Sequence, residues 1–173
     1  VNNAGMTRYA TMRKMTEQDF DDVIAVHLKG AWNGTRAAAA RMRERETGAI
    51  VNISSKTAIT GQGNTSAYVA AKHGVIGLTK TGCLEYAGQG IRVNALCPGI
   101  VGTGMWRGET GLSGKWAMEG ESEEASWERH QKIFLPQGVA QTPEDMGQMV
   151  VYLACAPHVT GQALAVDGGF SLG

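Results

Sequence analysis

The chain has 173 residues, with 16 Lys and Arg balanced by 16 Asp and Glu, so its formal net charge is +0. This length suits one domain with a sizeable core, and hydrophobic residues at 43% exclude a disordered chain. The balanced charge argues against a nucleic-acid partner, and no apolar run reaches the roughly 18 residues that a membrane span needs. Three scattered cysteines, without the spacing of a zinc site or a disulfide framework, favour a reduced, cytoplasmic setting.

The first predicted element is a long helix. Thr16 and Asp19 form a capping-box-like start, and apolar residues then recur at helical spacing. The pattern continues to a charged final stretch, which Gly48 terminates. Because Gly30 and Gly34 interrupt the pattern, we predict a bend near these glycines.

A strand, a helix and a second strand are predicted next. The β-branched and apolar runs at 49–54 and 91–96 are typical of buried strands in a parallel sheet. Between them, residues 67–86 carry small and apolar side chains at helical spacing, which predicts a helix.

Residues 102–137 lack a clear period and are rich in Gly, Glu and Ser. Long segments of this kind in a compact domain often cover a substrate. We therefore predict a substrate-binding loop or lid at 104–136, within a single domain that spans 1–173. Its three tryptophans either form an apolar wall for a carbonyl substrate or cover the core; they are Trp106, Trp116 and Trp127.

The last predicted elements are a helix and a strand. Thr142 is a suitable N-cap, Pro143 suits the first helical position, and acidic residues follow, so a helix is predicted to about Leu153. The run at 162–166 predicts a final strand. The alternation of helices and strands indicates an α/β fold with a parallel sheet.

The candidate chemistry lies in the helix at 67–86 and at the end of the first strand. Tyr68 and Lys72 are four residues apart and therefore share one helix face, and Ser55 follows a buried strand. Ligands bind at the carboxyl ends of strands in parallel sheets. A ketone that accepts hydride needs a proton on its oxygen, which Tyr68 can donate. We expect Lys72 to lower the pKa of Tyr68, and Ser55 to hold the carbonyl oxygen.

With these residues in place, the whole chain resembles a short-chain dehydrogenase/reductase. The further motifs that carry the resemblance are Asn2-Asn3-Ala4-Gly5, Pro98-Gly99-Ile100-Val101-Gly102-Thr103, and Thr160-Gly161-Gln162 with Asp167-Gly168-Gly169. The resemblance implies a Rossmann-like, doubly wound parallel sheet, of which this chain would form the C-terminal two thirds. It also implies a homotetramer that acts on a small-molecule alcohol or carbonyl compound.

The resemblance further implies the site. Ser55, Tyr68 and Lys72 would be catalytic, and the cofactor would be NAD or NADP. The residues implied in cofactor binding are Asn3, Ala4, Gly5, Tyr68, Lys72, Pro98, Gly99, Val101 and Thr103. No metal site is expected, because the histidines lack the spacing of metal ligands.

The chain departs from the family pattern at two places. His27 stands where the family usually has an Asn that relays protons to the lysine, so His27 either joins this relay or only replaces the Asn in packing. If it joins the relay, we expect its titration near pH 6.5 to enter the pH dependence of turnover. The Gly-rich loop TGxxxGxG does not occur in these residues, so we expect the chain to be a fragment.

These observations predict an NAD(P)-dependent oxidoreductase that interconverts a secondary alcohol and a ketone. A reductase for 3-oxoacyl groups on an acyl carrier or coenzyme A is the closest enzymatic alternative. A non-catalytic dinucleotide-binding protein, or an inactive truncated fragment, is the alternative from another class.

Overall fold

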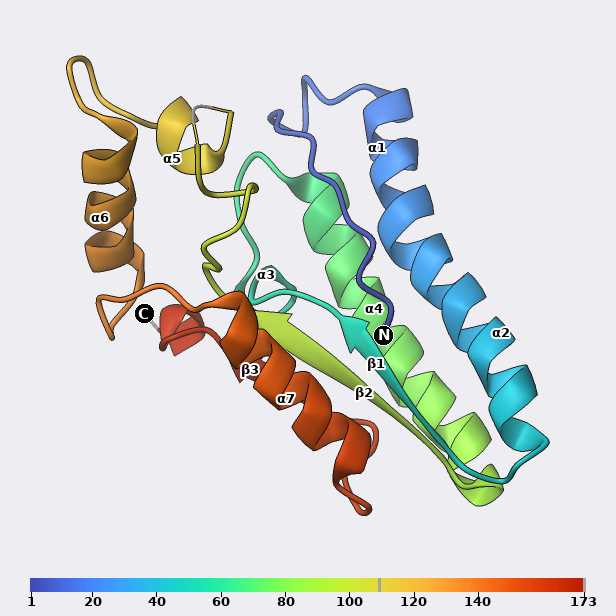
Figure 1. Ribbon diagram of the computed structural model, residues 1–173. Coiled ribbons are helices and arrows are strands. Elements are labelled where there is room, and N and C mark those ends of the chain that lie inside the picture. Colours follow the sequence, from blue (N-terminus) through green and yellow to red (C-terminus); the bar gives the residue numbers. More distant parts are fainter. Residues whose placement is uncertain (109, 173) are drawn as a thin grey trace.

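A three-stranded parallel sheet lies between helices in the computed structural model, which describes residues 1–108 and 110–172 (Figure 1). The strands lie in the order β1 (Gly48–Ile53), β2 (Ile91–Pro98) and β3 (Ala163–Val166). Asn2 adds an isolated parallel bridge to Asn52, on the edge of β1 that β2 leaves free. The predicted α/β fold with a parallel sheet is confirmed.

Helical segments occupy the connections between the strands. In chain order they are α1 (Glu17–Ile24), η1 (Ala25–Lys29), α2 (Gly30–Arg43), α3 (Thr57–Thr60), α4 (Ser66–Tyr86), η2 (Ala87–Gln89), α5 (Leu112–Lys115), α6 (Glu123–Phe134), α7 (Pro143–Cys155) and η3 (Phe170–Leu172). Within the described residues, none of these helices combines the length and the apolar character needed to cross a bilayer.

Apolar side chains leave the sheet on both faces. On one face Ile50 and Val93 pack in a cluster with Ala39 of α2. On the other face Val51 and Leu96 pack with Leu153 of α7, and Figure 1 shows α7 on the opposite side of the sheet from α2 and α4. Because neighbouring residues of a strand point to opposite faces, both faces are covered, and the sheet is doubly wound as expected.

The predicted long helix begins as expected but is divided. The Thr16 hydroxyl accepts a hydrogen bond from the Asp19 amide at 3.1 Å, which confirms the cap. The predicted irregularity occurs next to Gly30 but not at Gly34, because the π-helical turn η1 ends at Lys29, directly before Gly30. Gly34 serves close packing instead, since a Cβ there would lie 2.1 Å from the Asn2 Oδ1 atom. Wide turns of this kind are frequent at functional sites.

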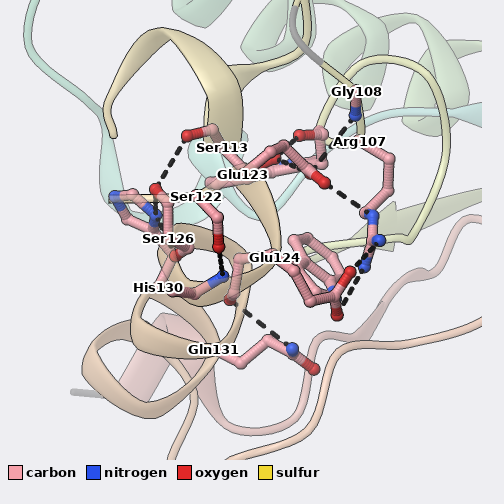
Figure 2. A network of polar contacts seen from close by, with 12 residues as sticks. Arg107, Gly108, Ser113, Ser122, Glu123, Glu124, Ser126, His130 and Gln131 are labelled. Atoms are coloured by element: carbon pink, nitrogen blue, oxygen red, sulfur yellow. Dashed lines mark hydrogen bonds and ion pairs between the residues drawn. The ribbon is translucent and has the colours of Figure 1, made fainter. Parts of the chain in front are cut away.

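The segment 102–137 is more ordered than its composition suggests. It contains α5 and α6, and the Ser122 hydroxyl caps α6 by accepting from the Ala125 amide at 3.2 Å. Figure 2 shows the polar network that joins the two helices, in which Ser113 donates to Glu123 at 2.5 Å. Ser126 also donates to the Ser113 carbonyl at 2.7 Å. The prediction of an irregular loop missed this helix, although a serine before two glutamates is an N-cap pattern.

Candidate active site

The predicted site residues meet at the edge of the sheet where β1 and β2 end. A cavity of about 480 Å³ opens there. Among the residues that line it are Asn3, Gly5, His27, Ser55, Tyr68, Lys72, Pro98, Gly99, Val101 and Thr103. Ala4 is the exception among the residues that the sequence singled out, because it is exposed and does not line this cavity.

Ser55 is held by the short turn that follows β1. Its Oγ accepts hydrogen bonds from the amide and the hydroxyl of Thr57, at 3.2 and 3.1 Å. A hydroxyl oxygen has two lone pairs, so the Ser55 proton remains free to be donated. The adjacent Ser54 donates to the Lys72 carbonyl at 2.9 Å and ties α4 to the end of β1.

Tyr68 and Lys72 are neighbours on α4, as their spacing predicts. The Lys72 ammonium donates to the Ile53 carbonyl at 2.6 Å and lies 5.5 Å from the centroid of the Tyr68 ring. Burial raises the pKa of Tyr68 to about 12, an effect that the nearby Ser55 side chain partly offsets. Burial lowers the pKa of Lys72 to about 8. The net pKa of Tyr68 is therefore raised, and not lowered as expected, because burial outweighs the other effects.

His27 enters the cavity from the π-helical turn η1. Its ring packs edge-on against Tyr68, with centroids 5.0 Å apart. The Nε2 atom lies 2.6 Å from the Met6 carbonyl oxygen and 3.0 Å from the Met6 amide nitrogen, and Nδ1 is buried without a partner among the described residues. Gly5 is required beside this ring, since a Cβ there would lie 2.9 Å from the His27 Cε1 atom.

His27 does not titrate near neutral pH in this structure. Burial, with the nearby Lys72 charge, lowers the pKa of His27 from 6.5 to about 4. The expectation of a limb near pH 6.5 in the pH dependence of turnover is therefore wrong. The neutral ring is the form present above about pH 4.

This shift predicts a measurable loss of stability in acid. Because the pKa of His27 is lower in the folded state, the unfolded state binds the proton first as the pH falls below 6.5. The contribution of His27 to the free energy of unfolding is fully present above pH 6.5 and is lost as the pH falls toward 4. The loss is about 1.4 kcal/mol per pKa unit of the shift and about 3 kcal/mol in all. Urea unfolding of His27→Asn in the full-length protein should lack this loss, whereas His73→Asn, an exposed control on α4, should retain it. Equal acid sensitivity of wild type and His27→Asn would refute the shift.

A second cavity, of about 570 Å³, adjoins the first and was not predicted. Tyr9, Lys56, Trp116 and Phe170 line it, together with Trp106, which also lines the first cavity. A small cavity of about 60 Å³ lies between the two and is lined by residues of both. Lys56 follows Ser55 directly in the sequence, and this adjacency is the one signal that could have identified it.

The tryptophans divide between the two roles left open by the sequence. Trp106 and Trp116 line the second cavity. Trp127 is buried in a core cluster with Ile100 and Leu135. The first two therefore form an apolar wall, and the third covers the core.

This geometry has counterparts among known proteins. A family model described as enoyl-(acyl carrier protein) reductase matches residues 1–171. The chain belongs to the short-chain dehydrogenase/reductase family. The cavity residues thus lie in the kind of fold that the motifs of this family imply.

Two relatives from the family illustrate its range. The chain is 46% identical over 172 residues to an uncharacterized oxidoreductase of Mycobacterium bovis, covering 98% of this chain and 64% of the relative. It is 40% identical over 171 residues to a 3-oxoacyl-(acyl-carrier-protein) reductase of Thermotoga maritima, with 98% and 64% covered. The chain therefore spans about 64% of the length of these relatives.

Solved structures of family members superimpose closely on this fold. ElxO with NADP bound has a TM-score of 0.86 at 30% identity, covering 99% of this chain and 66% of that chain. A 4-hydroxyisoleucine dehydrogenase complexed with NADH has a TM-score of 0.82 at 29% identity, with 99% and 68% covered. Structural neighbours thus include one that binds NADH and one that binds NADP.

Proposed function

We propose that the protein is an NAD(P)-dependent oxidoreductase that interconverts a ketone and a secondary alcohol, with Ser55, Tyr68 and Lys72 as its catalytic residues. The observation that carries the proposal is the convergence of these three side chains on one cavity at the carboxyl edge of the sheet. The family and the cofactors held by structural neighbours support the same reaction class.

The residues of the cavity fit the nicotinamide riboside part of NAD or NADP. Pro98, Val101 and Leu96 supply an apolar wall, whereas Asn3 and Thr103 supply polar groups. The buried His27 Nδ1 atom still needs a hydrogen-bond partner, which a carboxamide, a hydroxyl or a water can supply as donor or as acceptor. When bound, the cofactor supplies or accepts the hydride.

Reduction requires a proton at the carbonyl oxygen as the hydride reaches the carbon. The Tyr68 phenol gives its proton to that oxygen, whose C=O π electrons become the bond to hydrogen. The free Ser55 hydroxyl donates a hydrogen bond to the same oxygen and stabilises its developing charge. Lys72, an ammonium at neutral pH, stabilises the phenolate that remains.

Tyr68 is a phenol at neutral pH, which is the form that reduction requires. Burial raises its pKa to about 12, so the phenol is held in the protonated form, which is the form that donates. The general base needed for alcohol oxidation is the phenolate, which becomes more populated as the pH rises. Oxidation should therefore require a higher pH than reduction.

Absorbance of the reduced nicotinamide tests the proposed function directly. The full-length protein is mixed with NADH or NADPH and a panel of ketones, and ketone-dependent oxidation of the cofactor is expected. Tight cofactor binding, without turnover of any ketone or secondary alcohol, would favour a non-catalytic dinucleotide-binding protein instead.

A 3-oxoacyl reductase is the second candidate, and the 40% identity to the Thermotoga maritima enzyme favours it. Acetoacetyl-coenzyme A in the same assay distinguishes the two. A kcat/KM far above that for small ketones would support this second candidate.

We also propose that residues 104–136 bind the substrate, as part of a single domain over 1–173, and that the protein works in the cytoplasm as a homotetramer. The three cysteines are free thiols, which suits a reducing compartment. The structure leaves apolar side chains exposed on α2, α4 and α7, namely Trp32, Leu84, Val151 and Tyr152. Exposed apolar side chains on the helices that flank the sheet suit subunit contacts.

The proposed assembly predicts a mass in solution. Light scattering of the full-length protein should give four times the mass of one subunit, because closed symmetry buries the apolar faces of all copies. Leu84→Lys, on the exposed face of α4, should shift the population toward smaller species. A stable monomer of the wild type at micromolar concentration would contradict the proposal.

A further inference from the structure

The second cavity has aromatic walls and opens toward the catalytic residues. Tyr9 and Trp106 each pack edge-on against Trp116, with centroids 6.4 and 5.8 Å away, and Phe134 stacks on Phe170 at 5.3 Å. These rings line a volume of about 570 Å³, enough for a small organic molecule.

The connection to the catalytic site is direct. The small cavity of about 60 Å³ is lined by Ser55 and Tyr68 as well as by Lys56 and Trp106. A molecule whose carbonyl lies at Ser55 and Tyr68 can therefore extend past Lys56 into the aromatic cavity. The short passage places Lys56 close to the reacting carbonyl.

Lys56 is a cation without a counter-ion in this wall. The residue is only 8% exposed, and its Nζ lies 3.6 Å from the centroid of the Phe170 ring. Within residues 1–108 and 110–172, no carboxylate oxygen lies within 4.0 Å of this Nζ. Asp167 is the charged group that acts on it from nearby, but its two oxygens accept the Gly169 and Ser171 amides at 3.0 and 2.9 Å.

An ammonium in a largely buried side chain loses part of its hydration, which is unfavourable when no carboxylate contacts it. In agreement with this, burial lowers the pKa of Lys56, and the charge of Asp167 offsets only part of the effect. The cation–π contact with Phe170 supplies a weaker interaction than an ion pair in a dry site would. A carboxylate on the ligand would complete the site.

We propose that the substrate is an aromatic keto acid, with its carboxylate bound by Lys56 and its ring packed against Trp106 and Trp116. This inference rests on the proposed function, since Ser55 and Tyr68 must hold the ketone. Lys56 is then a specificity-determining residue, because it discriminates an acid from its neutral ester. Ser55, Lys56 and Tyr68 line the same small cavity, so a keto acid whose carboxylate lies a few bonds from the ketone fits between them.

Matched pairs of acid and ester test the inference. Benzoylformate and benzoylpropionate are compared with their methyl esters in the full-length protein with NADH or NADPH. The wild type should prefer the acids, and Lys56→Met should lower the acid-to-ester ratio of kcat/KM by about 10- to 100-fold, since a hydrogen bond to a charged group contributes about this much. Lys56→Arg should keep most of the preference, and Lys80→Met, on the exposed side of α4, should leave the ratio unchanged.

Binding supplies a readout that does not depend on turnover. Benzoylpropionate should quench tryptophan fluorescence at lower concentration than its ester, and Lys56→Met should remove this difference. An unchanged acid-to-ester ratio in Lys56→Met, or a wild-type preference for the esters, overturns the inference. Reduction of other ketones without binding of these acids overturns it while the proposed function stands. Lys56-dependent binding of the acids, without turnover of any ketone or secondary alcohol in the panel, supports the anion site and overturns the proposed function.

Discussion

Tyr68→Phe is expected to lower turnover by about 10²- to 10⁴-fold or more in the full-length protein, because this substitution removes the proton that general acid catalysis supplies. The substitution should slow the chemical step without weakening cofactor binding. The Phe ring keeps the edge-on contact with His27, whose centroid lies 5.0 Å away, so the cavity wall is retained. Cofactor affinity, measured by fluorescence of the reduced nicotinamide, should therefore change only a few-fold.

Tyr86→Phe is the matched control, because it makes the same change at the far end of α4. Tyr86 packs at the edge of the core cluster that includes Ala39 and Val93, away from the cavity. It should turn over like the wild type. Comparable turnover in Tyr68→Phe would mean that another group donates the proton, and it would remove the main support for the proposed mechanism.

Lys72→Met is expected to lower turnover by about 10²-fold or more, because the phenolate left after proton transfer loses its neighbouring cation. The variant should still fold. Methionine removes a buried charge and keeps the length of the side chain, although the Ile53 carbonyl loses the donor that lies 2.6 Å away. A structural loss would appear as a lower unfolding temperature, which is not expected at neutral pH.

The pH dependence of stability provides a second signature of Lys72. Burial lowers the pKa of Lys72 from 10.5 to about 8, so the unfolded state binds more protons between these values. The stability of the wild type should therefore rise with pH above 8, by about 1.4 kcal/mol per pH unit from this group. The comparison is made between pH 8 and 10, below the range where Tyr68 ionises. Lys72→Met should lack this rise. Lys80→Met, which replaces an exposed lysine, should show it. An identical rise in both variants would exclude Lys72 as the source of the rise.

The sequence predicted the elements whose signals are local. The strands β1, β2 and β3 follow from runs of β-branched and apolar residues, and the ends of α7 follow from the Thr142 cap, whose hydroxyl accepts from the Asp145 amide at 3.2 Å. The spacing of Tyr68 and Lys72 placed them on one helix face, because helical residues four apart are neighbours. The α6 helix was missed although its N-cap is local, because the apolar spacing that follows Ser122 is weak.

The proximity of Ser55 and Tyr68 was predicted from the parallel sheet, but the pKa values of the site residues were decided by tertiary packing. Spacing alone suggested that Lys72 would lower the pKa of Tyr68, whereas burial by residues from other elements raises it to about 12. The same applies to His27, whose lowered pKa depends on packing that the sequence does not encode locally. Desolvation depends on every atom that covers a group, so it follows from the folded chain as a whole.

The surroundings of Lys56 were also decided only by the tertiary structure. The sequence shows Lys56 after Ser55, but Phe170, whose ring lies 3.6 Å from its ammonium, comes from the last turn of the chain. The two meet because the carboxyl ends of the parallel strands β1 and β3, which flank β2, lie at the same edge of the sheet. Local patterns therefore determined the helices and strands and the spacing of Tyr68 and Lys72. The packing of segments that are distant in the sequence determined which charged side chains are buried and what the cavities can bind.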